Sequence, residues 1–182
     1  MEPILEIKKG KGLSVKLMKQ IDEIWQNAFP GNDPVKPDNL KRFSGDTFFI
    51  LRDSKNNVLS LGRLRPVKII FSGKKYGVQG IADIVSVVKK KGYGKVLMQA
   101  ILQHLSKNKQ TGIGFCKQKN RLFYKKSGFT VKKNLLNRFV YDEENKQKID
   151  DDIVFYIDGK NGFMKNMLKH PKEKAMIPVP HW

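Results

Sequence analysis

Apolar and polar residues recur along this chain with two periods, one typical of strands and one typical of helices. Residues 81–88 are mostly β-branched and apolar on both faces, as in a strand buried in the middle of a sheet. Further on, apolar side chains recur at helical spacing with polar residues between them; they are Leu97, Met98, Ile101, Leu102 and Leu105. A glycine-rich turn at 87–95 joins the two. The stretch therefore predicts a strand, a turn and a helix.

The same patterns predict the remaining elements. An edge strand is expected at 4–7, and Ser14 is a suitable N-cap for a helix whose apolar face carries Leu17, Ile21, Ile24, Trp25 and Ala28. Further strands are expected at 48–52, 58–64, 69–71, 76–88, 112–117, 129–132, 138–142 and 153–157, with short helices at 37–43 and 120–127. In the tail, 159–182, three apolar residues indicate one or two helical turns. Strands that meander before the glycine turn and mix with helices after it favour an α/β (α+β mixed) domain in three layers.

The composition is that of a globular protein. A chain of 182 residues can bury a core without disulfides or metal, so we expect a single domain over 1–182. The one cysteine, Cys116, cannot form an intramolecular disulfide, which indicates a reducing compartment. The chain lacks the run of about eighteen apolar residues that a membrane span needs. These features predict a soluble, cytoplasmic protein without a membrane partner.

The net charge of +19 invites a second interpretation, that the protein binds nucleic acid. Only six of the 36 basic residues are arginine, which is the residue favoured for bidentate contacts with phosphates and bases. The lysines are spread along the whole chain, and they accompany many Asn and Ile residues, so codon bias explains them as well as a binding face does. Nucleic acid therefore stays a possible partner that the sequence does not favour.

The glycine turn has the chemistry of an anion site. Gly92 and Gly94 lack Cβ atoms at the point where the first N–H groups of the helix have no partner within the helix. Lys89, Lys90 and Lys91 add ammonium groups around the same turn. A short glycine turn between strand and helix is often purely structural, so the interpretation as a phosphate site depends on the second half of the chain.

Two motifs in this order carry a resemblance to a known family. Lys89-x-x-Gly92-x-Gly94 resembles the (Arg/Gln)-x-x-Gly-x-(Gly/Ala) signature of the GNAT superfamily of acetyl-CoA-dependent N-acetyltransferases, with lysine in the first place. Residues 120–129, Asn-Arg-Leu-Phe-Tyr-Lys-Lys-Ser-Gly-Phe, resemble the F-Y-x-K-x-G-F segment of that superfamily at its usual spacing. The resemblance implies a splayed mixed sheet flanked by helices. It also implies a CoA site made by Val87, Val88, Lys89, Lys90, Lys91, Gly92, Tyr93, Gly94, Lys95, Asn120 and Phe123.

Acetyl transfer from a thioester to an amine requires a deprotonated amine, a polarised carbonyl and a proton for the leaving thiolate. Asp83 is the one acid in the apolar run 81–88, and we expect desolvation to raise its pKa, as suits a general base. The alternative is a solvated Asp at a strand end. Tyr124 matches the GNAT tyrosine that commonly serves as general acid, although it could also simply pack beside Phe123 and Phe129. Backbone N–H groups at 86–88 are candidates to polarise the carbonyl.

A looser similarity links much of the chain to aminoglycoside 2′-N-acetyltransferases. It is carried by the segments 24–31, 80–87, 123–129 and 151–155 and by a C-terminal tryptophan. In that family acidic groups receive the cationic sugar. The resemblance places them here at Asp33, Asp83, Asp152 and the carboxylate of Trp182.

The sequence leaves open both the acceptor and whether the chain is an enzyme. The acceptor is a small cationic amine by resemblance, but an aminoacyl-RNA or a protein amine is also possible. The chain could instead be a non-enzymatic basic module that binds nucleic acid or acyl-CoA. A metal site is not expected, because His104, His170 and His181 have no partners at the spacing of metal ligands.

Overall fold

The computed structural model describes residues 2–141 and 153–178. The chain forms two compact units, one containing 1–65 and 82–97 and the other containing 66–81 and 98–182. They are called unit 1 and unit 2. Strands β3 and β4 and helix α2 each contribute residues to both units.

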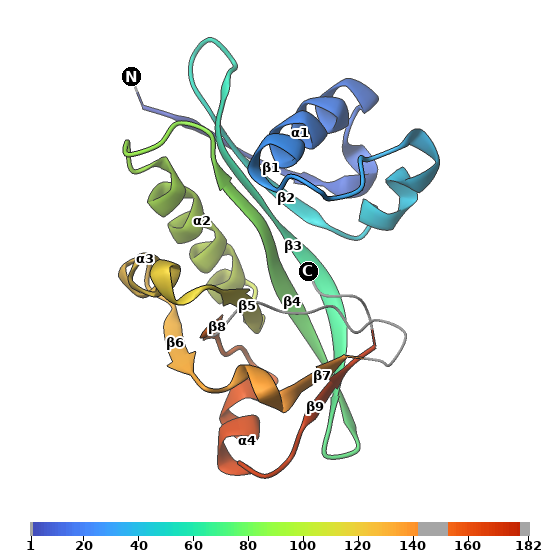
Figure 1. Cartoon of the computed structure of the whole chain (residues 1–182), viewed down its shortest axis with the longest axis vertical. Helices are drawn as coiled ribbons and strands as arrows, with labels where there is room; N and C mark the ends of the chain where they lie inside the picture. The colour runs from blue at the N-terminus through green and yellow to red at the C-terminus, as the bar shows by residue number, and fades with distance from the viewer. Residues whose placement is uncertain (1, 142–152, 179–182) are drawn as a thin grey trace. The chain divides into compact units, whose positions relative to one another are not determined.

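Helices and strands follow one another in mixed order (Figure 1). The strands are β1 (Ile4–Lys9), β2 (Thr47–Arg52), β3 (Val58–Phe71), β4 (Lys74–Ser86), β5 (Gly112–Cys116), β6 (Thr130–Lys133), β7 (Phe139–Tyr141), β8 (Ile153–Ile157) and β9 (Ala175–Ile177). The α-helices are α1 (Val15–Ala28), α2 (Tyr93–Lys107), α3 (Arg121–Lys126) and α4 (Phe163–Lys169). Four 3₁₀ turns are also present in the described residues, including one at Pro37–Phe43. No described helix is long and apolar enough to cross a membrane.

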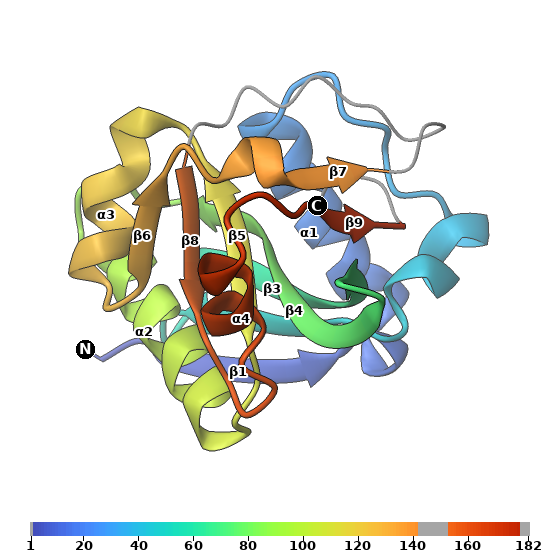
Figure 2. The ribbon, with the colours of Figure 1, turned by 90° about the horizontal axis from the view of Figure 1, so that it is seen from below.

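The strands form one mixed sheet, as the sequence predicts. Their order is β1-β2-β3-β4-β5-β8-β6, and β9 pairs with β3 and β7. Strand β5 runs parallel to β4 and antiparallel to β8, which lies between β5 and β6 (Figure 2). The pairing of β4 with β5 is confined to Gln79↔Gly112 and Gly80↔Ile113, although β4 continues to Ser86. The predicted α/β class with an open mixed sheet is confirmed.

In unit 1, helix α1 packs its apolar face on the sheet. Ser14 Oγ accepts a hydrogen bond from the N–H of Leu17, which satisfies one free donor at the helix start, as predicted. Trp25 lies in the core and contacts the rings of Phe43 and Phe48. The core of this unit consists of Met18, Ile21, Trp25, Phe43, Phe48, Ile50, Val58, Leu61 and Val85.

In unit 2, the tail predicted to contain helical turns forms α4 and then a strand, β9, that the sequence did not predict. Phe163, Met164 and Met167 of α4 are fully buried. Arg138 fixes the end of this helix by donating to the carbonyl oxygens of Met167 and His170. Residues 163–177 of the tail therefore contribute to the core of unit 2.

The prediction of separate strands at 58–64 and 69–71 is wrong, because β3 is continuous from Val58 to Phe71 through Pro66. Proline cannot donate a ladder hydrogen bond and is tolerated where one side of a strand lacks a partner. The pairing of β2 with β3 ends at Leu64, so Pro66 lies beyond it and is exposed.

Candidate functional site

The glycine turn lies between the end of β4 at Ser86 and the start of α2 at Tyr93, as predicted. Lys90 and Gly92 both adopt left-handed backbone conformations, with φ of 60° and 80°, and Lys91 between them does not. Such alternation turns successive N–H groups toward one side, as in anion-binding nests. No atom lies within 4 Å of the position that a Cβ of Gly92 would occupy, so the backbone there is open to a ligand.

At the start of helix α2, some backbone N–H groups make no hydrogen bond within the described residues. The N–H groups of Lys95 and Val96 both donate to the carbonyl oxygen of Gly92, at 2.9 and 3.2 Å. Among the described residues, the N–H groups of Tyr93 and Gly94 have no acceptor. Lys89, Lys90, Lys91 and Lys95 surround the turn and are exposed. Free N–H groups, the helix dipole and four cations together favour a phosphate.

Two residues assigned to the cofactor have backbone N–H groups that are already engaged. Val87 and Val88 both donate to the carbonyl oxygen of Leu59 in β3, at 2.9 and 3.3 Å. These donors are therefore not free to bind CoA or to polarise a carbonyl. The expectation that these two N–H groups serve the site is therefore corrected. Among the described residues, Tyr93 and Gly94 supply the free donors of the turn.

A buried ion-pair network surrounds Asp83 in unit 1. Arg63 of β3 donates from Nε to Asp83 Oδ2 and from Nη1 to Asp46 Oδ2. Its guanidinium also lies 5.7 Å from the ring centre of Trp25 and 5.2 Å from that of Phe43. Asp83 adopts a left-handed conformation, with φ of 51°, within strand β4. Asp46 and Arg63 were not predicted as site residues, although Arg63 is the one charged residue in the apolar segment Val58–Leu64.

The pKa directions in this network follow from burial and pairing. Burial raises the pKa of Asp46, and the charge of Arg63 opposes that rise only in part. Burial acts to lower the pKa of Arg63, but the charges of Asp83 and Asp46 outweigh it and raise that pKa. Burial and the neighbouring charge of Arg63 lower the pKa of Arg65. Arg63 thus keeps its proton because two carboxylates face it.

Tyr124 lies in unit 2, on α3, and its ring is largely buried. It stacks on Phe155 of β8 with ring centres 3.7 Å apart and planes 12° from parallel. Phe123 meets it edge-on at 5.0 Å, while Phe129 packs separately against Phe155. The ring therefore has a packing role, which the sequence analysis gave as the alternative, and Phe155 is a partner that the sequence did not specify. A role for its hydroxyl group stays a prediction.

The predicted site residues fall into three groups. Unit 1 contains Asp33, which is exposed, together with Asp83 and the glycine turn. Unit 2 contains Tyr124, Phe123 and Asn120, the last of which is exposed. Asp152 and Trp182 lie outside the described residues. Of the predicted substrate-binding acids, Asp83 is the one found in a network of charged side chains among the described residues.

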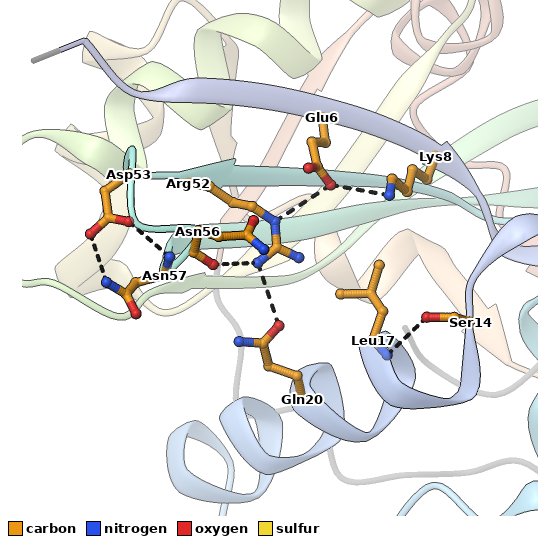
Figure 3. A network of polar contacts seen from close by, with 9 residues as sticks. All are labelled: Glu6, Lys8, Ser14, Leu17, Gln20, Arg52, Asp53, Asn56 and Asn57. Carbon is orange, nitrogen blue, oxygen red and sulfur yellow. Dashed lines mark hydrogen bonds and ion pairs between the residues drawn. The ribbon is translucent and has the colours of Figure 1, made fainter.

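A separate hollow of about 650 Å³ lies in unit 1, beside α1 and β1, and none of the predicted site residues lines it. Several of the polar side chains that line this hollow contact one another (Figure 3). Arg52 donates to the carbonyl oxygen of Asn56 at 2.9 Å and lies 3.4 Å from both Gln20 Oε1 and Glu6 Oε2. Because none of the predicted site residues lines the hollow and Arg52 already contacts Asn56 and Glu6, we do not assign the acetyl-transfer site to it. Among the described residues, no three His, Cys, Asp or Glu side chains cluster as metal ligands would.

Solved structures of acyltransferases are similar to this chain. A probable N-acyltransferase from Enterococcus faecalis V583 is 20% identical with a TM-score of 0.53, covering 69% of this chain but only 32% of its own length. An acyl-CoA N-acyltransferase from Pseudomonas aeruginosa is 14% identical with a TM-score of 0.57, over 84% of this chain and 97% of that one. The GNAT family N-acetyltransferase YhbS from Escherichia coli, solved in complex with CoA, is 11% identical with a TM-score of 0.62, over 98% and 91%.

The chain has the GNAT fold. No protein-family model and no curated protein matches the sequence. The resemblance that the two motifs carry is thus confirmed at the level of the fold. In this GNAT fold, β4, the glycine turn and α2 follow one another without interruption, and the Arg63 network lies beside the same strand.

Replacing Arg63 by Met should leave Asp46 buried without a cation and lower the free energy of unfolding by about 3–5 kcal/mol at pH 7. Burial raises the pKa of Asp46 in the folded protein above its ordinary value of 3.8 in the unfolded chain. Protonation of this acid therefore contributes stability below pH 3.8, and this contribution is lost as the pH rises through the folded pKa. Removing Arg63 raises the folded pKa further, so the deficit should shrink as the pH falls from 7 toward 4.

Urea unfolding followed by tryptophan fluorescence measures this difference at each pH. Arg42→Met is the matched control, because Arg42 is exposed and lies 4.6 Å from the ring centre of the same Phe43. It should cost less than about 1 kcal/mol, as exposed charges usually do. A deficit of Arg63→Met that does not depend on pH would show that Asp46 is not the group left unpaired.

Proposed function

We propose that the protein is an acetyl-CoA-dependent N-acetyltransferase that acts on the primary amine of a small cationic molecule. The observation that carries the proposal is the open turn between β4 and α2, with its left-handed Gly92 and the free N–H groups of Tyr93 and Gly94. This turn contains the motif Lys89-x-x-Gly92-x-Gly94 and lies in a GNAT fold. A related fold, that of YhbS, was solved with CoA bound.

The pyrophosphate of CoA is assigned to the turn from Lys89 to Lys95. Backbone N–H groups at a helix start bind phosphate oxygens without needing a specific side chain, and glycine permits close approach. The exposed lysines of the turn carry positive charge, opposite to that of the phosphates. When bound, acetyl-CoA supplies an acetyl group as a thioester with a thiolate leaving group. Asn120 and Phe123 are further proposed contacts for CoA, from the second motif.

The acceptor must lose a proton before it attacks. An alkylammonium of pKa near 10.4 costs roughly 4.6 kcal/mol to deprotonate at pH 7. Asp83 is the proposed base, directly or through a water molecule. Arg63 donates to Oδ2 of this carboxylate, which leaves Oδ1 for an amine. Asp83 passes the first ammonium proton to solvent. It then takes the second amine proton as the C–N bond forms and the C–S bond breaks, while the leaving sulfur takes a proton from a separate donor.

Tyr124 is the proposed donor of the proton to the leaving sulfur. Its ring is fixed by stacking on Phe155, so its hydroxyl group has a defined position. A phenol of ordinary pKa near 10 is protonated at neutral pH and can protonate a thiolate. Holding the donor through ring packing gives the orientation that general acid catalysis requires.

For the acceptor we propose an aminoglycoside-like amine, received by Asp33, Asp83, Asp152 and the carboxylate of Trp182. The support is the sequence similarity of the segments around three of these acids and of the C-terminal tryptophan. An aminoacyl-RNA or a protein amine is the alternative, and it is favoured only by the net charge of +19.

Tyr93→Pro should weaken CoA binding at least tenfold, because it removes one of the two free N–H groups. A charge-assisted hydrogen bond contributes about 1.5–3 kcal/mol. Proline is tolerated at the first position of a helix, where Tyr93 lies, so α2 should persist. Tyr93→Ala is the control, since it loses the same ring and keeps the N–H. Calorimetry with CoA that gives equal affinities for the two variants would remove the phosphate from this turn.

Tyr124→Phe keeps the ring on Phe155 and removes the hydroxyl group. The variant should remain folded, with a melting temperature within about 5 °C of the wild type, while kcat should fall about 10²–10⁴-fold, the usual contribution of a general acid. Phe129→Leu, which changes the other ring packed on Phe155, should alter stability more than kcat. Full turnover by Tyr124→Phe at neutral pH would make Tyr124 a packing residue only.

Asp152→Asn should raise KM for a cationic amine at least tenfold and leave KM for acetyl-CoA unchanged, because it removes a charge-assisted contact to the amine alone. Asp151→Asn changes the net charge equally and is the control, with an expected effect below about twofold. Steady-state kinetics with a set of aminoglycosides provide the measurement. Faster acetylation of an aminoacyl-RNA than of any aminoglycoside would overturn the acceptor assignment while leaving acetyl transfer intact.

A further inference from the structure

Strand β1 leaves one edge of the sheet open. Among the described residues it pairs only with β2, from Ile4↔Arg52 to Lys9↔Thr47. Five of its six residues are exposed, and the apolar side chains of Ile4, Leu5 and Ile7 are 57%, 39% and 47% exposed. An open strand edge with exposed apolar side chains is a template for pairing with another strand.

The hydrogen bonds of β1 show which of its peptide groups face outward. Gly10 continues the register of β1 with β2, and its N–H donates to the carbonyl oxygen of Asp46 at 2.8 Å. In an antiparallel ladder, hydrogen-bonded and non-hydrogen-bonded pairs alternate. The even-numbered residues Glu6 and Lys8 therefore bond to β2. The odd-numbered residues Leu5, Ile7 and Lys9 point their N–H and C=O groups away from the sheet.

We propose that this edge pairs with β1 of a second copy of the chain, in antiparallel register centred on Ile7. Ile7 then exchanges two hydrogen bonds with the partner's Ile7. Leu5 does the same with the partner's Lys9, and Lys9 with the partner's Leu5. Every outward peptide group of the strand is satisfied by an outward group of the other copy, as an isologous interface requires.

The charges on the strand select the same register. Centred on Ile7, Glu6 lies opposite the partner's Lys8, and Lys8 lies opposite the partner's Glu6. Both are non-hydrogen-bonded pairs, where opposed side chains come closest. A shift of the centre to Glu6 would oppose two glutamates, and a shift to Lys8 would oppose two lysines, both of which are unfavourable. Charge complementarity thus identifies a second copy as the occupant.

Within one copy, Glu6 and Lys8 already form an ion pair beside this edge. Glu6 lies 3.4 Å from Arg52 Nε and 3.3 Å from Lys8 Nζ, so its carboxylate is held beside the strand (Figure 3). The side chain of Lys8 is 43% exposed and can reach outward. On the opposite face, Ile7 meets the partner's Ile7, and Leu5 lies against the alkyl stem of the partner's Lys9, which would cover apolar surface that is now exposed.

Sedimentation equilibrium tests the dimer directly. The wild type should associate with a dissociation constant below about 100 µM. Ile7→Pro should raise that constant at least tenfold, because it removes an outward N–H while the bonds to β2 come from even-numbered residues. Val15→Pro is the matched control: it replaces an apolar residue, 68% exposed, with proline at the first position of α1, where proline is tolerated. Its constant should stay within twofold of the wild type.

Cross-linking tests the register. In the proposed pairing the two copies of residue 7 have Cα atoms about 5.5 Å apart, whereas the two copies of residue 5 are roughly 14 Å apart along the strands. A bismaleimide that spans only the shorter separation should cross-link Ile7→Cys at least tenfold faster than Leu5→Cys. Cys116 is buried, so the wild type provides the background rate. A monomeric wild type, a dimer unaffected by Ile7→Pro, or equal cross-linking of the two variants would overturn the proposal.

Discussion

The buried charge of Arg63 constrains the arrangement of several elements in unit 1. A buried guanidinium is stable only when its donors are paired, and breaking one of its pairs leaves an uncompensated charge. Arg63 comes from β3, and its partners come from other elements: Asp46 at the start of β2 and Asp83 from β4. The rings of Trp25 and Phe43 lie against its face. The positions of α1, β2 and β4 around β3 therefore depend on one another through this residue.

The network also explains an unusual backbone conformation. A left-handed residue other than glycine costs of order 1–3 kcal/mol and persists only where its surroundings hold it. Asp83 is left-handed within β4, and its carboxylate pairs with Arg63. The ion pair offsets the strain, and the strain turns the acid toward the arginine instead of continuing the alternation of the strand. The sequence interpretation of Asp83 as a carboxylate surrounded only by apolar residues missed this partner, because β3 and β4 meet only in the folded sheet.

Local patterns predicted the fold well where the local signal was strong. The N-cap Ser14, the amphipathic face of α2 and the glycine turn all lie where the periodicity places them. The sequence predicts two strands, 58–64 and 69–71, where β3 is continuous through Pro66. Proline is tolerated there because the pairing with β2 ends at Leu64, which the sequence does not state. The same holds for the site. The glycine motif predicted the turn, whereas the pair of Arg63 with Asp46 and the stacking of Tyr124 on Phe155 are long-range contacts without a local signature.

The charge balance around Asp83 limits how an amine could be recognised. Asp46 and Asp83 are offset by Arg63 and Arg65, whose charges all act on one another, so this cluster offers little net attraction to a cation. Exposed lysines elsewhere are screened beyond roughly 8 Å at physiological salt, so they neither repel a bound amine strongly nor replace an acid at contact distance. Selectivity for a cationic acceptor must therefore come from carboxylates outside the cluster. For the cationic acceptor proposed above, the acids at 33, 152 and the C-terminus are the candidates to meet that requirement.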